Sequence, residues 1–156
     1  MSFEKKTLRD IDVRGKRVLL RAYYNVPLKD GEIFSDYRIT PSVPTIKYLV
    51  DQGAKVIICS HLGRPEHAKD VSCSLKIVAK RLGQLLDQEI KFAPYCIGSE
   101  VQDMALNLQP KEILLLENLR YHKEEEQNDP NFAKKLAGLA EVFVQDGFGV
   151  VHRAHA

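Results

Sequence analysis

Arginine and histidine residues follow four of the five short apolar runs in this sequence. Run by run, these residues are Arg21, then His61 and Arg64, then Arg120, and finally His152, Arg153 and His155; Asn25 also follows the first run. The planar guanidinium of arginine binds phosphate and carboxylate through paired hydrogen bonds. The set therefore predicts a site for a small ligand that carries several negative charges. For any single arginine, a simpler alternative is a strand cap or an ion pair with a surface Asp or Glu.

The common sequence motifs for nucleotide binding do not occur beside these residues. The chain has no G-x-x-x-x-G-K-[ST] loop, and no G-x-G-x-x-G follows its first apolar run. The sequence thus predicts neither a Walker-type nor a Rossmann-type nucleotide cradle.

The apolar runs have the length and composition of buried β-strands. They are rich in Val, Ile and Leu and are separated by polar segments. The expected strands are 17–21 (RVLLR), 56–60 (VIICS), 89–92 (EIKF), 113–117 (ILLLE) and 142–144 (VFV).

Helical periodicity fills the segments between these runs. Apolar residues recur at helical spacing over 75–86 and over 101–108, and a further helix is expected over 43–51. Ser99 and Gln102 have the spacing of a capping box, and Asp129-Pro130 is typical of a helix start. Gly53 is expected to end the helix over 43–51.

Strands alternate with helices along the whole chain, which predicts right-handed β-α-β crossovers. The expected fold class is α/β: a Rossmann-like, three-layer α/β/α sandwich around a mostly parallel sheet of about five strands. Ligands of such sheets bind beyond the carboxyl ends of the strands, where the arginines and histidines are expected.

Size and composition limit the remaining possibilities. A chain of 156 residues with 44% hydrophobic content is expected to form one domain, 1–156. The formal net charge of +2 gives no reason to expect a nucleic-acid or membrane partner. The N-terminus has no apolar signal region, so a cytoplasmic location is expected. Three cysteines without a C-x-x-C pair are expected to be reduced thiols: Cys59, Cys73 and Cys96.

Longer motifs of the chain resemble, in the same order, those of the N-terminal half of phosphoglycerate kinases. The matching stretches are GKRVLLRAYYNVP (15–27), DYRI (36–39), PTIKYLVDQGAK (44–55), SHLGRP (60–65), LLLENLRYHKEEE (114–126) and QDGFGVVHRAHA (145–156). In that family the N-terminal domain holds 3-phosphoglycerate, and the C-terminal domain holds Mg-ATP or Mg-ADP. The resemblance implies a 3-phosphoglycerate half-site and no cofactor in this chain.

The resemblance also implies roles for individual residues. Tyr23 and Asn25 lie at the glycerate, and His61 lies near its carboxylate. Arg38 resembles the arginine that neutralises the phosphoryl group during transfer, a reaction that depends on positioning and electrostatic stabilisation. The 3-phosphate is held by Arg64, Arg120 and Arg153, and the expected binding set also includes Tyr24, Leu62 and Gly63.

The chain departs from the family in its length. Family members continue beyond H-R-A-H-A into an interdomain helix, a nucleotide domain and a tail. We therefore expect an excised or engineered domain that does not complete the kinase reaction alone.

The chain also departs from the family at the edge of the expected site. Tyr23 stands where the family pattern R-x-D-[FY]-N-V-P has an aspartate that contacts the substrate hydroxyl. Gln145, Val150 and Val151 replace polar or small residues of the pattern N-D-A-F-G-T-A-H-R-A-H and are expected to make that edge more apolar. One hypothesis is a monomeric domain that binds phosphoglycerate-like anions weakly. The alternative is a structural module that self-associates through the apolar edge.

Several residues also have purely structural interpretations. His61 is equally typical of a loop or a helix cap. His152 and His155 have the spacing of metal ligands on a helix, but no carboxylate or thiol lies nearby in sequence, so no metal site is expected. The segment 123–131 is expected to be a solvated loop. Three residues are expected to face the core: Phe132, Leu136 and Leu139.

Overall fold

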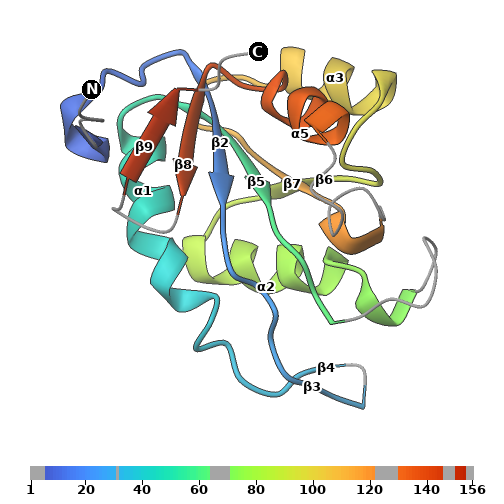
Figure 1. Cartoon of the computed structure of the whole chain (residues 1–156). Coiled ribbons are helices and arrows are strands. Elements are labelled where there is room, and N and C mark those ends of the chain that lie inside the picture. The colour runs from blue at the N-terminus through green and yellow to red at the C-terminus, as the bar shows by residue number, and fades with distance from the viewer. Residues whose placement is uncertain (1–5, 31, 64–70, 122–129, 146–149, 154–156) are drawn as a thin grey trace.

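A computed structural model describes residues 6–30, 32–63, 71–121, 130–145 and 150–153. Within these residues the chain forms one seven-stranded sheet, in the order β1-β9-β8-β2-β5-β7-β6, and a separate two-stranded hairpin (Figure 1). Helices cover both faces of the large sheet. The predicted three-layer α/β/α architecture is therefore confirmed.

Five neighbouring strands of the large sheet are parallel, as the sequence predicted. The central residues of β2, β5 and β7 are buried by helices on both faces, which explains their nearly continuous apolar runs. The five strands are β2 (Arg17–Arg21), β5 (Lys55–Cys59), β6 (Ile90–Ala93), β7 (Ile113–Leu116) and β8 (Val142–Gln145).

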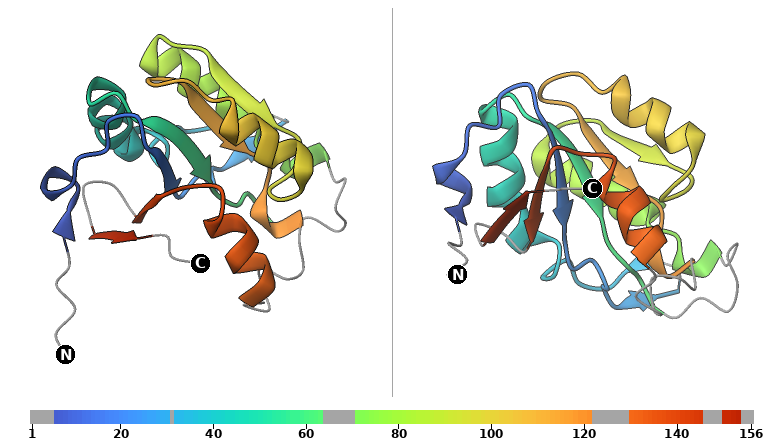
Figure 2. Two further views of the ribbon diagram at one scale, coloured as in Figure 1. Left: turned by 90° about the horizontal axis from the view of Figure 1, so that it is seen from above. Right: turned by 45° about the horizontal axis from the view of Figure 1, so that its top comes forward.

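The helices divide into two pairs, one on each face of the sheet (Figure 2). α1 (Val43–Asp51) and α2 (Lys76–Leu86) share one buried cluster with Leu20 of β2 and Ile58 of β5. α3 (Ser99–Leu106) and α5 (Pro130–Ala137) share the other cluster with Leu19 of β2. Successive strand residues thus point into opposite layers.

Two of the three predicted helix boundaries follow from local chemistry. α1 ends at Asp51, and Gly53 after it has a φ of +78°, a conformation that glycine adopts at little cost. α5 begins at Pro130, whose fixed φ suits a first helical turn. The prediction of a capping box at Ser99 is wrong. Ser99 already belongs to α3, and Gly98, with a φ of +114°, occupies the cap position without a side-chain hydrogen bond.

The sequence did not predict two antiparallel strands and a hairpin. β9 (Val150–Arg153) runs antiparallel beside β8, and β1 (Lys6–Thr7) pairs with β9. Val150 and Val151 lie within β9, where Val151 pairs with Val144 of β8 and Val150 pairs with Thr7 of β1, so both lie near the carboxyl end of β8. The hairpin consists of β3 (Leu28–Lys29) and β4 (Glu32–Ile33).

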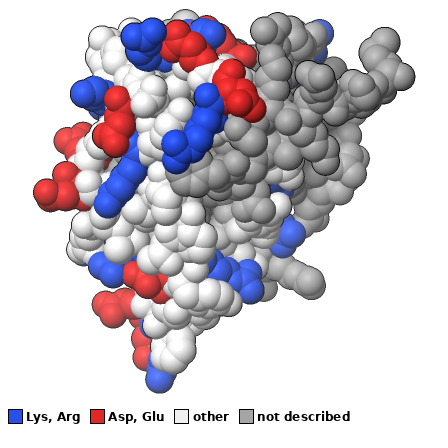
Figure 3. Space-filling view, turned by 90° about the vertical axis from the view of Figure 1, so that its left-hand side faces the viewer, with Lys and Arg blue, Asp and Glu red and all other residues white. Residues whose placement is uncertain are grey.

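Short 3-10 helices complete the described chain. They are η1 (Leu8–Asp10), η2 (Thr40–Ser42), η3 (Val71–Cys73) and η4 (Leu119–Tyr121). None of the described helices is long and apolar enough to cross a membrane. On the face that Figure 3 shows, basic and acidic side chains are interspersed, and no extended patch of one sign is visible among the described residues.

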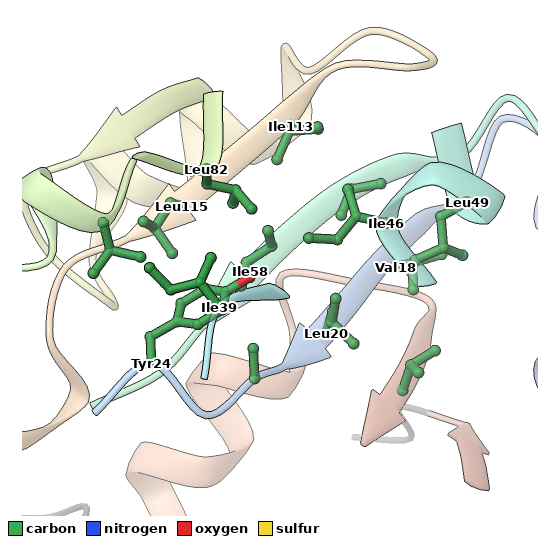
Figure 4. Close-up of a cluster of buried hydrophobic side chains, with 14 of the residues drawn as sticks. Val18, Leu20, Tyr24, Ile39, Ile46, Leu49, Ile58, Leu82, Ile113 and Leu115 are labelled. Atoms are coloured by element: carbon green, nitrogen blue, oxygen red, sulfur yellow. The ribbon is translucent and has the colours of Figure 1, made fainter. Parts of the chain in front are cut away.

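Tyr24, which the resemblance placed in the binding set, lies in the core. Its ring is fully buried among residues such as Ile39 and Ile58 (Figure 4). Ser42 donates to the carbonyl of Ile39, so the Tyr24 hydroxyl donates to Ser42 Oγ, 2.7 Å away. Burial raises the pKa of Tyr24 well above that of an exposed phenol, and the bond to Ser42 offsets this only in part. Tyr24 is therefore a core residue.

Shortening Ile58 should strongly destabilise the fold. Ile58 is fully buried in β5, between β2 and β7. Ile58→Ala should lower the free energy of unfolding by about 2–5 kcal/mol in urea denaturation, because it leaves a cavity in the core. Leu106→Ala is the matched control. Leu106 is 62% exposed, so its effect should stay within about 0.5 kcal/mol, and equal losses would contradict the core assignment.

The pKa of Tyr24 predicts a loss of stability in alkali. The folded chain favours the neutral phenol, so unfolding releases a proton once the pH exceeds about 10, the ordinary pKa of tyrosine. At neutral pH, Tyr24→Phe should cost about 0.5–1.5 kcal/mol through the lost bond to Ser42. Above pH ~10 only the unmodified chain loses stability through Tyr24. The difference between the two free energies of unfolding should therefore narrow, by at most about 1.4 kcal/mol per pH unit. Parallel stability curves across that range would show that the burial of Tyr24 has no such effect.

Candidate functional site

Three loops leave the sheet side by side at the carboxyl ends of β2, β5 and β7. In the parallel register, Arg21 of β2 lies beside Cys59 of β5, and Ile58 of β5 lies beside Leu115 of β7. The loops that follow are 22–27, 60–63 and 117–121. The predicted site residues Asn25, Gly63 and Arg120 lie on these three loops.

Gly63 is the point where the three loops meet. Its backbone N–H donates to Asn25 Oδ1 at 2.8 Å, and its carbonyl accepts a hydrogen bond from Arg120 Nη1 at 3.4 Å. Its φ is +60°, and a Cβ at this position would lie 3.2 Å from the sulfur of Cys73. A larger residue would therefore strain the backbone and press on Cys73, which explains the glycine between Leu62 and Arg64.

Ser60 joins the same loops below the surface. It is buried, its Oγ accepts the backbone N–H of Tyr24 at 2.9 Å, and its carbonyl accepts the N–H of Leu119. The side chains of Tyr24 and Leu62 are also buried, so they are not placed to reach a ligand. His61, between Ser60 and Leu62, is partly exposed.

Two site residues that the sequence analysis did not single out follow β7 directly. Glu117 and Asn118 are both buried. Glu117 accepts hydrogen bonds from the Ser74 hydroxyl at 2.7 Å and from the Leu75 N–H at 2.8 Å. Asn118 bonds to Leu62 and to the backbone of Arg120. The signal that would have found them is the abrupt change from the apolar run ILLL to two polar residues.

Tyr23 and Arg38 line one pocket at the end of β2, next to these loops. Tyr23 is 45% exposed, and Arg38 Nε donates to the Tyr37 hydroxyl at 3.0 Å. The Arg38 guanidinium also lies over the Tyr37 ring, 5.6 Å from its centroid, in a cation–π contact. The pocket has a volume of about 370 Å³ and is lined by Leu20, Arg21, Ala22, Tyr23, Tyr37, Arg38, Pro41 and Ser42.

The structure does not bring Arg153 to this edge. In β9 its backbone lies opposite Val142, the first residue of β8, and the His152 backbone lies opposite Phe143. Gln145, the last residue of β8, is the one that pairs with Arg21. The expectation that His152 and Arg153 follow β8 at the carboxyl edge is therefore wrong, because the chain reverses into an antiparallel strand.

Other predicted residues lie outside the described part of the chain. These are Arg64, His155 and the segment 122–129, so the expected solvated loop is described only at 130 and 131, which begin α5. Phe132 and Leu139 are buried and Leu136 is partly buried in the core, as predicted. Within the described ranges, no three His, Cys, Asp or Glu residues gather into a possible metal site.

A larger groove lies elsewhere on the molecule. It has a volume of about 890 Å³, and Ile77 of α2 and Ile90 and Phe92 of β6 contribute apolar side chains to it. Its lining includes Lys76 and Lys80 but no arginine, the side chain whose planar guanidinium binds phosphate through paired hydrogen bonds. The carboxyl-edge loops are therefore the better candidate for the predicted anion site.

Comparison with known proteins identifies the family of this chain. The sequence profile of the family described as "Phosphoglycerate kinase" matches residues 8–156. The chain is 54% identical over 153 residues to the phosphoglycerate kinase of Aquifex aeolicus and 56% identical over 155 residues to that of Dictyoglomus turgidum. Each match covers 97% of this chain but only 38% and 39%, respectively, of the relative.

Solved structures give the same result. The crystal structure of phosphoglycerate kinase from Pyrococcus horikoshii is similar over 90% of this chain and 36% of its own, with a TM-score of 0.82 and 34% identity. The structure of phosphoglycerate kinase from Coxiella burnetii is similar over 97% of this chain and 37% of its own, with a TM-score of 0.80 and 35% identity. By sequence and by fold, this chain belongs to the phosphoglycerate kinase family.

Proposed function

We propose that this chain is the 3-phosphoglycerate-binding part of a phosphoglycerate kinase. The observation that carries the proposal is the junction at Gly63, where Asn25 and Arg120 from two other loops bond to one backbone unit. Arg120 presents a guanidinium at this edge, and Arg64 follows Gly63 directly in the sequence. Two arginines there suit the 3-phosphate, because guanidinium groups bind phosphate bidentately.

In this proposal Arg38 acts on the group in transfer. Phosphoryl transfer needs little covalent help from the protein, and its barrier falls when cations neutralise the charge that spreads over the phosphoryl oxygens. Arg38 is exposed, and it lines one pocket together with Arg21 at the end of β2. A ligand in that pocket would lie near the charge of Arg38. Arg153 is not part of this proposed set, because its backbone lies at the other end of β8.

In this proposal, the nucleotide binds to the part of the full-length relatives that this chain does not span. This chain spans 38% and 39% of the two curated relatives named above, and its sequence contains neither common phosphate-binding glycine motif. Mg-ATP or Mg-ADP would supply or accept the phosphoryl group from that other part. The chain's own residues bind and orient the glycerate, and we place this work in the cytoplasm. The alternative of a self-associating module has no support from the comparisons.

Removing Arg120 should abolish most of the protection that 3-phosphoglycerate gives. A ligand that binds only the folded state raises its stability with the logarithm of ligand concentration, so the ligand should raise the melting temperature. The shift should shrink at high salt, because the screening length falls from about 8 Å at 0.15 M to about 3 Å at 1 M. Arg120→Ala should lose most of the shift in a thermal unfolding assay.

Arg14→Ala is the matched control for Arg120→Ala. Arg14 is an exposed arginine before β2, at the opposite end of the sheet, where it pairs with Asp12. Its replacement should leave the shift unchanged. Equal shifts for Arg120→Ala and the unmodified chain would place the anion elsewhere.

Tyr23→Asp should tighten binding of 3-phosphoglycerate. The family's aspartate at this position accepts a hydrogen bond from the glycerate hydroxyl, which the bulkier tyrosine cannot do from the same place. One such bond is worth about 0.5–1.5 kcal/mol, so the affinity should rise by up to about tenfold in calorimetric titration. The added negative charge opposes this gain, so the arginines must outweigh its repulsion. Tyr23→Phe, which keeps the ring, should not improve binding. An aspartate variant no tighter than the unmodified chain would show that Tyr23 does not impair the site.

A further inference from the structure

The side-chain amide of Asn118 uses its full hydrogen-bonding capacity inside the protein. Its Oδ1 accepts the backbone N–H of Leu62 at 3.2 Å and the backbone N–H of Arg120 at 3.0 Å. Its Nδ2 donates to the carbonyl of Leu62 at 2.7 Å and to that of Cys73 at 2.8 Å. A carboxamide offers two donors and two acceptor positions, and all four are occupied here. Asn118 itself is 0% exposed.

These bonds connect segments that are far apart in the sequence. Leu62 precedes Gly63 in the loop after β5, Cys73 ends η3, and Arg120 lies in η4. Arg120 returns to the first of these loops through its bond to the Gly63 carbonyl. Asn118 and Arg120 therefore bond to consecutive residues of the same loop: Asn118 to the backbone of Leu62, and Arg120 to the backbone of Gly63.

Glu117, the neighbouring buried residue, has different partners. Its carboxylate accepts hydrogen bonds from Ser74 and Leu75 at the start of α2, and from the N–H of Asn118. The side-chain bonds of Glu117 thus anchor a helix. Those of Asn118 fix the backbone positions from which Gly63 and the Arg120 side chain extend.

We propose that Asn118 is a positioning residue for anion binding: without touching the ligand, it holds the loop of Gly63 and the backbone of Arg120 at the spacing that the anion requires. The inference rests on the proposed function, because it assumes that this edge binds 3-phosphoglycerate. Small displacements of a binding group cause large losses, so a bond network of this kind controls affinity as well as stability.

Asn118→Asp tests the network with almost no change in shape. The aspartate keeps an acceptor for the Leu62 and Arg120 N–H groups. Its second oxygen replaces the Nδ2 donor and faces the carbonyls of Leu62 and Cys73, so two attractive contacts become repulsive. The loop should move away from Asn118, and the distance between Gly63 and Arg120 should change.

The experiment measures the affinity for 3-phosphoglycerate by calorimetry at a temperature where each variant is folded. Asn118→Asp should bind at least about tenfold more weakly than the unmodified chain. Lowering the pH should narrow that ratio, because a protonated aspartate regains one donor. Val101→Ala is the matched control. It removes buried methyl groups from α3, which lies outside the three site loops, so it should lower the urea midpoint without changing affinity.

A second measurement needs no substitution and decides the question if Asn118→Asp does not fold. In NMR spectra of the unmodified chain, 3-phosphoglycerate should shift the side-chain NH₂ signals of Asn118 and leave those of Gln109 in place. Gln109 is an exposed residue whose Nε2 bonds to Asn107. Unshifted Asn118 signals at saturation, or equal affinity of a folded Asn118→Asp, would overturn the positioning role alone. An unmodified chain that does not bind 3-phosphoglycerate would overturn the proposed function and this inference with it.

Discussion

The parallel register of β2, β5 and β7 fixes where every loop of the candidate site begins. Hydrogen bonds pair Arg21 with Cys59 and Ile58 with Leu115, so the three strands end within a residue or two of one another. Both faces of these strands are buried, and a slip by one residue would exchange the side chains of the two core layers. Core packing therefore enforces the register, and the register in turn places the loops.

Hydrogen bonds between the loops fix them relative to one another and so define the candidate site. Asn25, Gly63 and Arg120 lie on different loops and meet through two bonds to one glycine. Beneath them, Ser60 and Asn118 satisfy buried backbone groups that would otherwise be costly to leave unpaired. The site is thus preorganised by the same polar groups that allow irregular backbone to be buried.

The sequence predicted the parts of the molecule that depend on local pattern. The five parallel strands and the helices α1, α2, α3 and α5 follow from apolar periodicity. Gly53 marks the end of α1 because glycine tolerates a positive φ, and Pro130 marks the start of α5 because the φ of proline is fixed. Whether a side chain points into the core or toward solvent was harder to predict. Tyr24 alternates with exposed Tyr23, and only the packed core shows that its ring points inward. The cap at Ser99 failed because Gly98 competes for the same position. The reversal of β9 depends on long-range pairing with β8 and β1, which local periodicity does not encode, and Arg153 was misplaced with it.

The central claim is that the loops after β2, β5 and β7 form the anion site. The most direct measurement is an NMR titration of ¹⁵N-labelled chain with 3-phosphoglycerate, followed at every backbone amide. The account predicts that the largest shifts occur at Asn25, Gly63 and Arg120 and that they reach saturation together. Shifts concentrated at Ile90 and Phe92, in the groove beside α2, or no saturable shifts at all, would contradict it.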